Sequence, residues 1–129
     1  MDTLNAFHGQ AIKYVETQDV SEGVEADLYT FDNDNSRDLA IVRVAASHKT
    51  PLQRILKGKK TVEGYMEGRG SLSLMHSDGS QIVRAYPDSE MTETIVEIND
   101  IMQWSAETNL TFYEICWPPY EDGRFENLT

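Results

Sequence analysis

Cysteine and long apolar runs are almost absent from this 129-residue sequence. Cys116 is the one cysteine, so no disulfide can form within the chain. No run approaches the roughly 20 apolar residues of a membrane-spanning helix, and the first ten residues lack the basic and apolar segments of a secretory signal. These absences predict a cytoplasmic protein with no membrane partner.

Positive charge is also scarce. Eleven Lys and Arg stand against 22 Asp and Glu, which gives a net charge of -11. A nucleic-acid-binding protein needs a basic face to displace counterions from phosphates, so we expect no nucleic-acid partner. The short basic cluster of Arg54, Lys57, Lys59 and Lys60 indicates a solvated turn, and the rim of an anion-attracting pocket is the alternative.

Convincing amphipathic helices and internal repeats are missing as well. Period-two patterns rich in β-branched residues dominate, separated by turn signals at spacings of roughly 8–12 residues. This organisation is typical of an all-β sandwich or barrel. Strands are expected at 24–31 (an edge strand), 39–46, 52–56, 61–67, 71–75, 81–86, 91–98 and 110–117.

From about residue 47 to 116 the order of elements resembles the two motifs of the cupin superfamily. Gly68 matches the glycine that closes the first motif, and Asn99-Asp100 match the start of the second. The resemblance implies an all-β fold of the cupin type, a double-stranded β-helix or jelly-roll barrel. Narrower similarity to a subgroup of small single-domain cupins, for which we know of no established activity, is carried by residues 50–54, 61–65, 102–104 and 113–128.

The same resemblance gives a domain organisation. Residues 1–129 would form a single cupin-like domain. Residues 1–20 would be an N-terminal arm, and residues 118–129 a C-terminal tail that packs on the barrel or on a partner subunit.

The metal-ligand positions of the cupin pattern depart from it in this sequence. Gln53, Ile55, Thr61 and Leu110 stand where the pattern has three histidines and a glutamate. One amide oxygen does not hold a transition metal, so we expect no usual metal site and no cofactor. The three histidines are scattered; His48 with Gln53 and Glu63 is the alternative metal set.

Alternation along the strands predicts which side chains face the barrel interior. If Gln53, Thr61 and Leu110 face inward, then residues two and four positions further along their strands do so too. A register error of one residue would turn the whole set outward. The predicted lining combines polar side chains with apolar walls: Gln53, Thr61, Glu63, Tyr65, Glu114 and Cys116 among Ile55, Leu110 and Phe112.

Glu63 and Glu114 are the most specific candidate pair for acid–base chemistry in this lining. Two carboxylates inside one barrel raise each other's pKa, and burial raises both further, so that one can act as a general acid or base near neutral pH. In the alternative, one of them faces solvent or pairs with an arginine such as Arg43, Arg54 or Arg84.

The remaining candidates have two interpretations each. Tyr65 orients a ligand or fills barrel volume, and Trp104, placed with Gln103 in a loop at the barrel mouth, stacks on a ligand or caps the core. Cys116 is expected to be an inert buried thiol. The candidate catalytic residues are therefore Glu63, Glu114 and Tyr65, and the candidate ligand-binding residues are Gln53, Thr61, Gln103, Trp104 and Phe112.

Apolar residues expected on the outer surface predict a homodimer through sheet faces. They are Val62, Met66, Leu72, Leu74, Ile82 and Ile115.

Three functions are compatible with these residues. The first is a small-molecule-binding cupin, without the usual metal, whose ligand is a polar metabolite such as a sugar or small organic acid. The alternative is an isomerase, epimerase or lyase that uses a barrel glutamate as general base, with or without a metal. The third is a structural or regulatory module whose barrel is simply filled.

Overall fold

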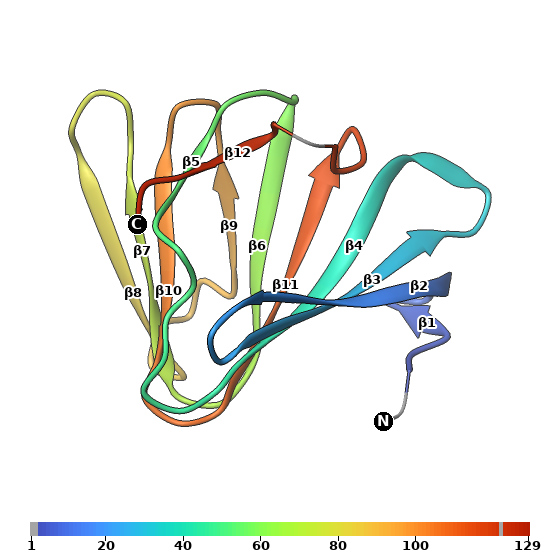
Figure 1. Cartoon of the computed structure of the whole chain (residues 1–129), viewed down its shortest axis with the longest axis horizontal. Helices are drawn as coiled ribbons and strands as arrows, with labels where there is room; N and C mark the ends of the chain where they lie inside the picture. Colours follow the sequence, from blue (N-terminus) through green and yellow to red (C-terminus); the bar gives the residue numbers. More distant parts are fainter. Residues whose placement is uncertain (1–2, 122) are drawn as a thin grey trace.

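A computed structural model describes residues 3–121 and 123–129, which contain strands and turns and no helix (Figure 1). The all-β prediction is therefore confirmed, and no long apolar helix of the kind that crosses a bilayer occurs among these residues. The strands are β1 (Ala6–Phe7), β2 (Gln10–Ser21), β3 (Val24–Phe31), β4 (Asp34–Val44), β5 (Gln53–Ile55), β6 (Lys60–Glu67), β7 (Gly70–Met75), β8 (Gln81–Tyr86), β9 (Glu93–Val96), β10 (Ile101–Ala106), β11 (Leu110–Trp117) and β12 (Phe125–Asn127).

The strands form two curled antiparallel sheets around one interior. The large sheet has the order β1-β2-β3-β4-β11-β6-β9, and the small sheet has the order β12-β5-β10-β7-β8. In Figure 1, β7, β8 and β10 lie on one side of the molecule and β2, β3 and β4 on the other. Strands distant in sequence are neighbours in both sheets, because β11 is inserted between β4 and β6 and β10 between β5 and β7.

Most predicted strands are present, and the differences have local reasons. β3 has the predicted bounds, but it lies between β2 and β4 and is not an edge strand. β2 was missed because its apolar residues do not keep a regular alternation along the strand: one of its twelve residues, Ile12, is buried. Residues 10–20 of the expected N-terminal arm thus belong to a strand of the large sheet.

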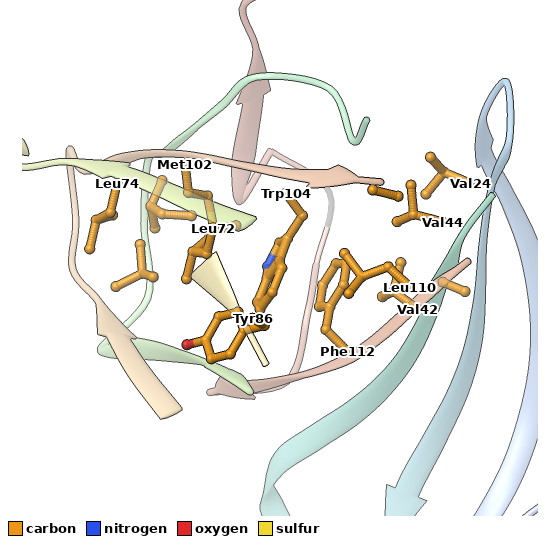
Figure 2. Close-up of a cluster of buried hydrophobic side chains, with 14 residues drawn as sticks. Val24, Val42, Val44, Leu72, Leu74, Tyr86, Met102, Trp104, Leu110 and Phe112 are labelled. Atoms are coloured by element: carbon orange, nitrogen blue, oxygen red, sulfur yellow. The ribbon is translucent and has the colours of Figure 1, made fainter. Parts of the chain in front are cut away.

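The interior is filled by apolar side chains from both sheets (Figure 2). Leu72 and Leu74 of β7 are part of this core, each 1% exposed, so their predicted outward orientation is wrong. In β6 the odd-numbered residues face the interior, and in β7 the even-numbered residues face it. The turn at Gly68, whose φ is +96°, therefore changes the phase of the alternation between the two strands.

A second apolar cluster covers the outer face of the large sheet. Val62 and Ile115 are buried there beneath the N-terminal strand, whose Phe7 lies edge-on to Tyr113 at a centroid distance of 4.8 Å. The chain thus covers by itself most of the apolar surface from which the homodimer was predicted, leaving Met66 exposed and Ile82 half-buried against the core. The homodimer stays a prediction, but fewer exposed apolar residues support it than the sequence suggested.

The C-terminal segment is fastened to the barrel by a strand and by one arginine. β12 pairs with β5, and the Arg124 side chain just before it is 1% exposed. Its guanidinium donates hydrogen bonds to the carbonyl oxygens of Lys60 (2.8 Å), Trp117 (3.2 Å) and Pro118 (2.9 Å), and to Thr61 Oγ1 (3.2 Å). A buried cation that satisfies several carbonyl groups holds the tail against the end of the large sheet.

We expect Arg124→Met to destabilise the protein by about 3 kcal/mol, because the variant leaves buried carbonyl oxygens without donors. Chemical denaturation measures the change. Arg54→Met is the matched control: the Arg54 side chain is 40% exposed and its Nη1 lies 3.7 Å from Glu126 Oε2, so its loss should cost less than about 1 kcal/mol. Equal effects of the two variants would contradict the anchoring role.

Candidate functional site

A cavity of about 520 Å³ lies between the inner face of the large sheet and the C-terminal segment. Its volume lies within the range of small-molecule sites, roughly 300–1,000 Å³. Apolar side chains of β3, β4 and β11 form one part of the lining: Val24, Ala26, Leu28, Ala40, Val42 and Phe112. Polar side chains form another part: Gln18, Asp19, Asp38, Thr50, Gln53, Glu114 and Asn127.

Glu63 and Glu114 lie directly opposite each other on neighbouring strands. β6 and β11 pair antiparallel with Glu63 across from Glu114, so both side chains are on the inner face of the sheet. Glu114 is half-buried and lines the cavity, while Glu63 is 1% exposed and lies deeper in the barrel. The predicted inward orientation of the pair is the one observed.

The Glu63 carboxyl group is fixed by a tryptophan of the opposite sheet. Trp104 Nε1 donates a hydrogen bond of 2.9 Å to Glu63 Oε1. Glu63 Oε2 is buried and has no hydrogen-bond partner among the described residues. One oxygen of this carboxyl group therefore accepts a hydrogen bond, and the other can carry a proton or accept a further hydrogen bond.

Burial raises the pKa of Glu63 well above its usual range, and the charge of Glu114 raises it further. The hydrogen bond from Trp104 acts in the opposite direction and is the smallest contribution. Glu63 therefore favours its protonated form, with a proton available on the side of Glu114. The two carboxyl groups make a pair that can share one proton.

Asp38 is a further cavity carboxylate, and the sequence analysis did not single it out. It lies across from Cys116 in the β4–β11 pairing, two positions along from the partner of Glu114. Burial raises the pKa of Asp38, although its Oδ2 accepts a hydrogen bond of 2.9 Å from the backbone of Tyr120. The signal was present: extending the alternation of Ala40 and Val42 back by one step places Asp38 on the same face.

Cys116 also reaches this cavity but is not activated there. Its Sγ lies 3.6 Å from Glu114 Oε1, and burial together with that carboxylate raises the pKa of the thiol far above its usual range. A thiol that keeps its proton is a poor nucleophile, so the observed environment agrees with the expected inert thiol.

The predicted ligand-binding residues fall into two groups. Gln53 and Phe112 line the cavity, and the Gln53 side chain donates a 3.0 Å hydrogen bond to Asn127. Thr61 is fully buried beneath Arg124 and does not belong to the cavity lining. Gln103 was predicted at the barrel mouth, but it lies within β10 and donates a 2.9 Å hydrogen bond to the backbone of Thr50.

Trp104 and Tyr65 belong to an aromatic stack that fills the other half of the barrel. Trp104 is also in β10, not in a loop, and it is a core residue, so it is not available to stack on a ligand. Figure 2 shows its indole between Tyr86 and Phe112, at centroid distances of 5.8 and 4.4 Å. Tyr65 continues the stack at 4.6 Å from Tyr86, and its hydroxyl donates to the backbone of Gly68, away from the two glutamates.

The arginines considered as partners of the glutamates are engaged elsewhere. Arg43 pairs with Asp27 and Glu25, and Arg54 with Glu126. Arg84 donates to Thr94 at 2.9 Å and to a backbone carbonyl. The solvent-facing or arginine-paired alternative for Glu63 is therefore wrong.

Nor do the described residues assemble a metal centre from three or more His, Cys, Asp or Glu side chains. His48 is half-buried and its ring contacts the backbone of Ala46, whereas Glu63 is deep in the barrel. The residues at the usual cupin ligand positions, with two aliphatic side chains among them, do not fit a transition metal.

Comparison with protein-family models and with curated proteins finds no match. Among solved structures, oxalate decarboxylase from Bacillus subtilis at pH 4.6 is similar with a TM-score of 0.68 at 18% identity, covering 84% of this chain and 28% of that chain. The Lactobacillus farciminis oxalate decarboxylase–formate complex gives 0.68 at 14% identity, covering 91% of this chain and 33% of that chain.

At such low identity the likeness shows the fold alone. These neighbours are cupin-fold proteins, so the chain has the predicted cupin-type double-stranded β-helix. It spans about a third or less of their length. B. subtilis oxalate decarboxylase has Mn(II) centres. In the present chain, the carboxyl pair of Glu63 and Glu114 lies inside the barrel instead.

The carboxyl pair predicts a particular pH dependence of stability. The folded pKa of Glu63 is above its unfolded value, so the folded state binds the proton more tightly, and stability falls as pH rises through the folded pKa. Glu63→Gln removes this titration while keeping an acceptor for the Trp104 indole. Relative to the wild type, we expect the variant to gain free energy of unfolding as the pH rises above the ordinary pKa range of a glutamate.

Chemical denaturation at several pH values measures this difference. The exposed Glu90→Gln is the control, and its difference from the wild type should stay constant over the same range. Parallel pH profiles for wild type and Glu63→Gln would show that Glu63 titrates normally.

Proposed function

We propose that this protein binds a small polar ligand in the cavity lined by Glu114, Asp38 and Gln53. The observation that carries the proposal is the lining itself, in which an apolar floor meets a few converging polar groups. An interior that was merely structural would be packed throughout, as the half containing Trp104 is.

The charge of the lining narrows the ligand class. Asp38 and Glu114 are acidic, and no Lys, Arg or His side chain lines the cavity within the described part of the chain. A carboxylate ligand would meet like charge without a cationic partner. Of the two ligand classes considered from the sequence, the lining therefore disfavours a small organic acid and is compatible with a neutral sugar.

Acid–base catalysis is a second candidate, favoured by the shared-proton arrangement of Glu63 and Glu114. Glu114 meets the cavity, so it would accept a proton from a carbon atom of the substrate and return it to the same or a neighbouring carbon. Glu63 lies deeper in the barrel and would act through Glu114, as a positioning residue. This chemistry fits an isomerase or an epimerase; in a lyase, the proton taken by Glu114 would pass to the leaving group as its bond to carbon breaks. Tyr65 takes no part because its hydroxyl is bound to Gly68.

Filling the cavity tests the binding proposal. Ala40→Phe places a ring in the open space, and Ala85→Phe on the exposed face of β8 is the control. A library of neutral, cationic and anionic fragments is screened by protein-observed NMR. We expect fragments to shift amides of β3, β4 and β11 in the wild type and in Ala85→Phe, and roughly tenfold weaker binding in Ala40→Phe. The absence of any fragment that shifts these strands would overturn the binding proposal.

The catalytic candidate has its own test. Dihydroxyacetone, a small polyol with C–H bonds next to a carbonyl, is incubated with the protein in deuterated water, and deuterium incorporation is followed by NMR. We expect an acceleration of roughly 10²-fold over protein-free solution, lost in Glu114→Gln and kept in Glu90→Gln. Exchange that is unaffected by Glu114→Gln would remove the general base from the mechanism.

A further inference from the structure

We propose that the ligand of this cavity is a small organic ammonium ion, with its charged nitrogen between Glu114 and Asp38 and its hydrocarbon part against Phe112 and the apolar floor. The inference rests on the proposed binding function of the same cavity and names its ligand class.

The two carboxylates are placed to hold one cationic group. Asp38 is opposite Cys116 and Glu114 is opposite Ala40 in the β4–β11 pairing, so the two acids are diagonal neighbours on one face. Side chains in this relation have Cβ atoms about 7 Å apart. An ammonium group between them can donate to both carboxylates.

No cation of the described residues takes this position. Burial raises the pKa of Asp38 and the charge of Arg124 lowers it, but the terminal nitrogens of Arg124 donate to three backbone carbonyls and to Thr61. The described lining contains no cationic side chain. Half-buried carboxylates without a counter-ion are unfavourable, and burial already raises the pKa of Asp38, so a bound cation would stabilise the pair.

Glu63 supplies an independent observation. Its Oε2 is buried without a partner on a carboxyl group that is 1% exposed and faces Glu114 across the strand pair. A protonated Oε2 needs a hydrogen-bond acceptor, and Glu114 is the group in position. A cation held by Glu114 on its cavity side would offset the repulsion between the two carboxyl groups.

The rest of the cavity points to an organic cation and not to a bare metal ion. A volume of about 520 Å³ is far larger than an ion requires, and Val42, Ala26 and Phe112 give it apolar walls. Phe112 stacks against Trp104, with centroids 4.4 Å apart and planes 9° apart, and it also lines the cavity. An aromatic ring in this place attracts an ammonium group as well as hydrocarbon.

Three probes of matched shape and different charge test the inference: cyclohexylammonium, cyclohexanol and cyclohexanecarboxylate. Dissociation constants are measured by NMR titration of the full chain near neutral pH. We expect cyclohexylammonium to bind at least about tenfold more tightly than cyclohexanol, and the carboxylate to bind most weakly. Glu114→Gln and Asp38→Asn should each weaken cyclohexylammonium about tenfold, whereas the exposed control Glu90→Gln should leave its affinity unchanged.

The comparison of probes on the wild-type chain needs no variant and stays informative if one fails to fold. Equal or tighter binding of cyclohexanol or the carboxylate would overturn the ammonium inference and leave the cavity as a binding site. A second outcome would also overturn this inference alone. In that outcome none of the three probes binds, while other fragments bind to the wild type and bind more weakly to Ala40→Phe. If no fragment of any kind binds, the proposed function itself fails.

Discussion

The hydrogen bond from Trp104 to Glu63 joins the two sheets at the centre of the barrel. Trp104 belongs to β10 of the small sheet and Glu63 to β6 of the large sheet. Because a buried indole N–H and a buried carboxyl oxygen are both unfavourable without partners, each group fixes the position of the other. The aromatic stack around Trp104 runs from Tyr65 to Phe112 and therefore begins and ends on the large sheet.

This arrangement divides the barrel interior into a solid half and a hollow half. The stacked rings fill one half, each pair contributing about 0.5–1.5 kcal/mol beyond its apolar burial. The other half is left open between β3, β4 and the C-terminal segment, with Phe112 at the boundary. Glu63 and Glu114 lie at the same boundary, so the acid–base pair has a rigid support on one side and an accessible space on the other.

The sequence predicted the fold and the orientation of the carboxyl pair because both depend on alternation within single strands. Glu63 and Glu114 share the parity of Thr61 and Phe112, and the register shift of β11 lies before Phe112, so it does not turn Glu114 outward. Leu72 was misplaced because the phase changes across the turn at Gly68, which alternation alone does not report.

Other parts of the site depend on contacts between distant segments. Motif spacing placed Trp104 in a loop, although the alternation of Met102, Trp104 and Ala106 indicated a strand, and tertiary pairing with β7 decided the outcome. Arg124 could not be predicted, because its partners are carbonyl groups of residues about 60 positions earlier and of the segment just before it. Asp38 was missed because the alternation of inward-facing residues in β4 was not extended back from Ala40 to residue 38.

Part of the cavity wall comes from the C-terminal segment, which contributes Phe125 and Asn127. That segment is attached through Arg124, through the backbone of Tyr120 and through β12, a strand of three residues that pairs with β5. Substitutions at Phe125 or Asn127 can therefore alter the shape of the cavity without changing any strand register of the large sheet. Part of the cavity lining is thus encoded outside the large sheet, so related sequences can vary this wall while the barrel stays the same.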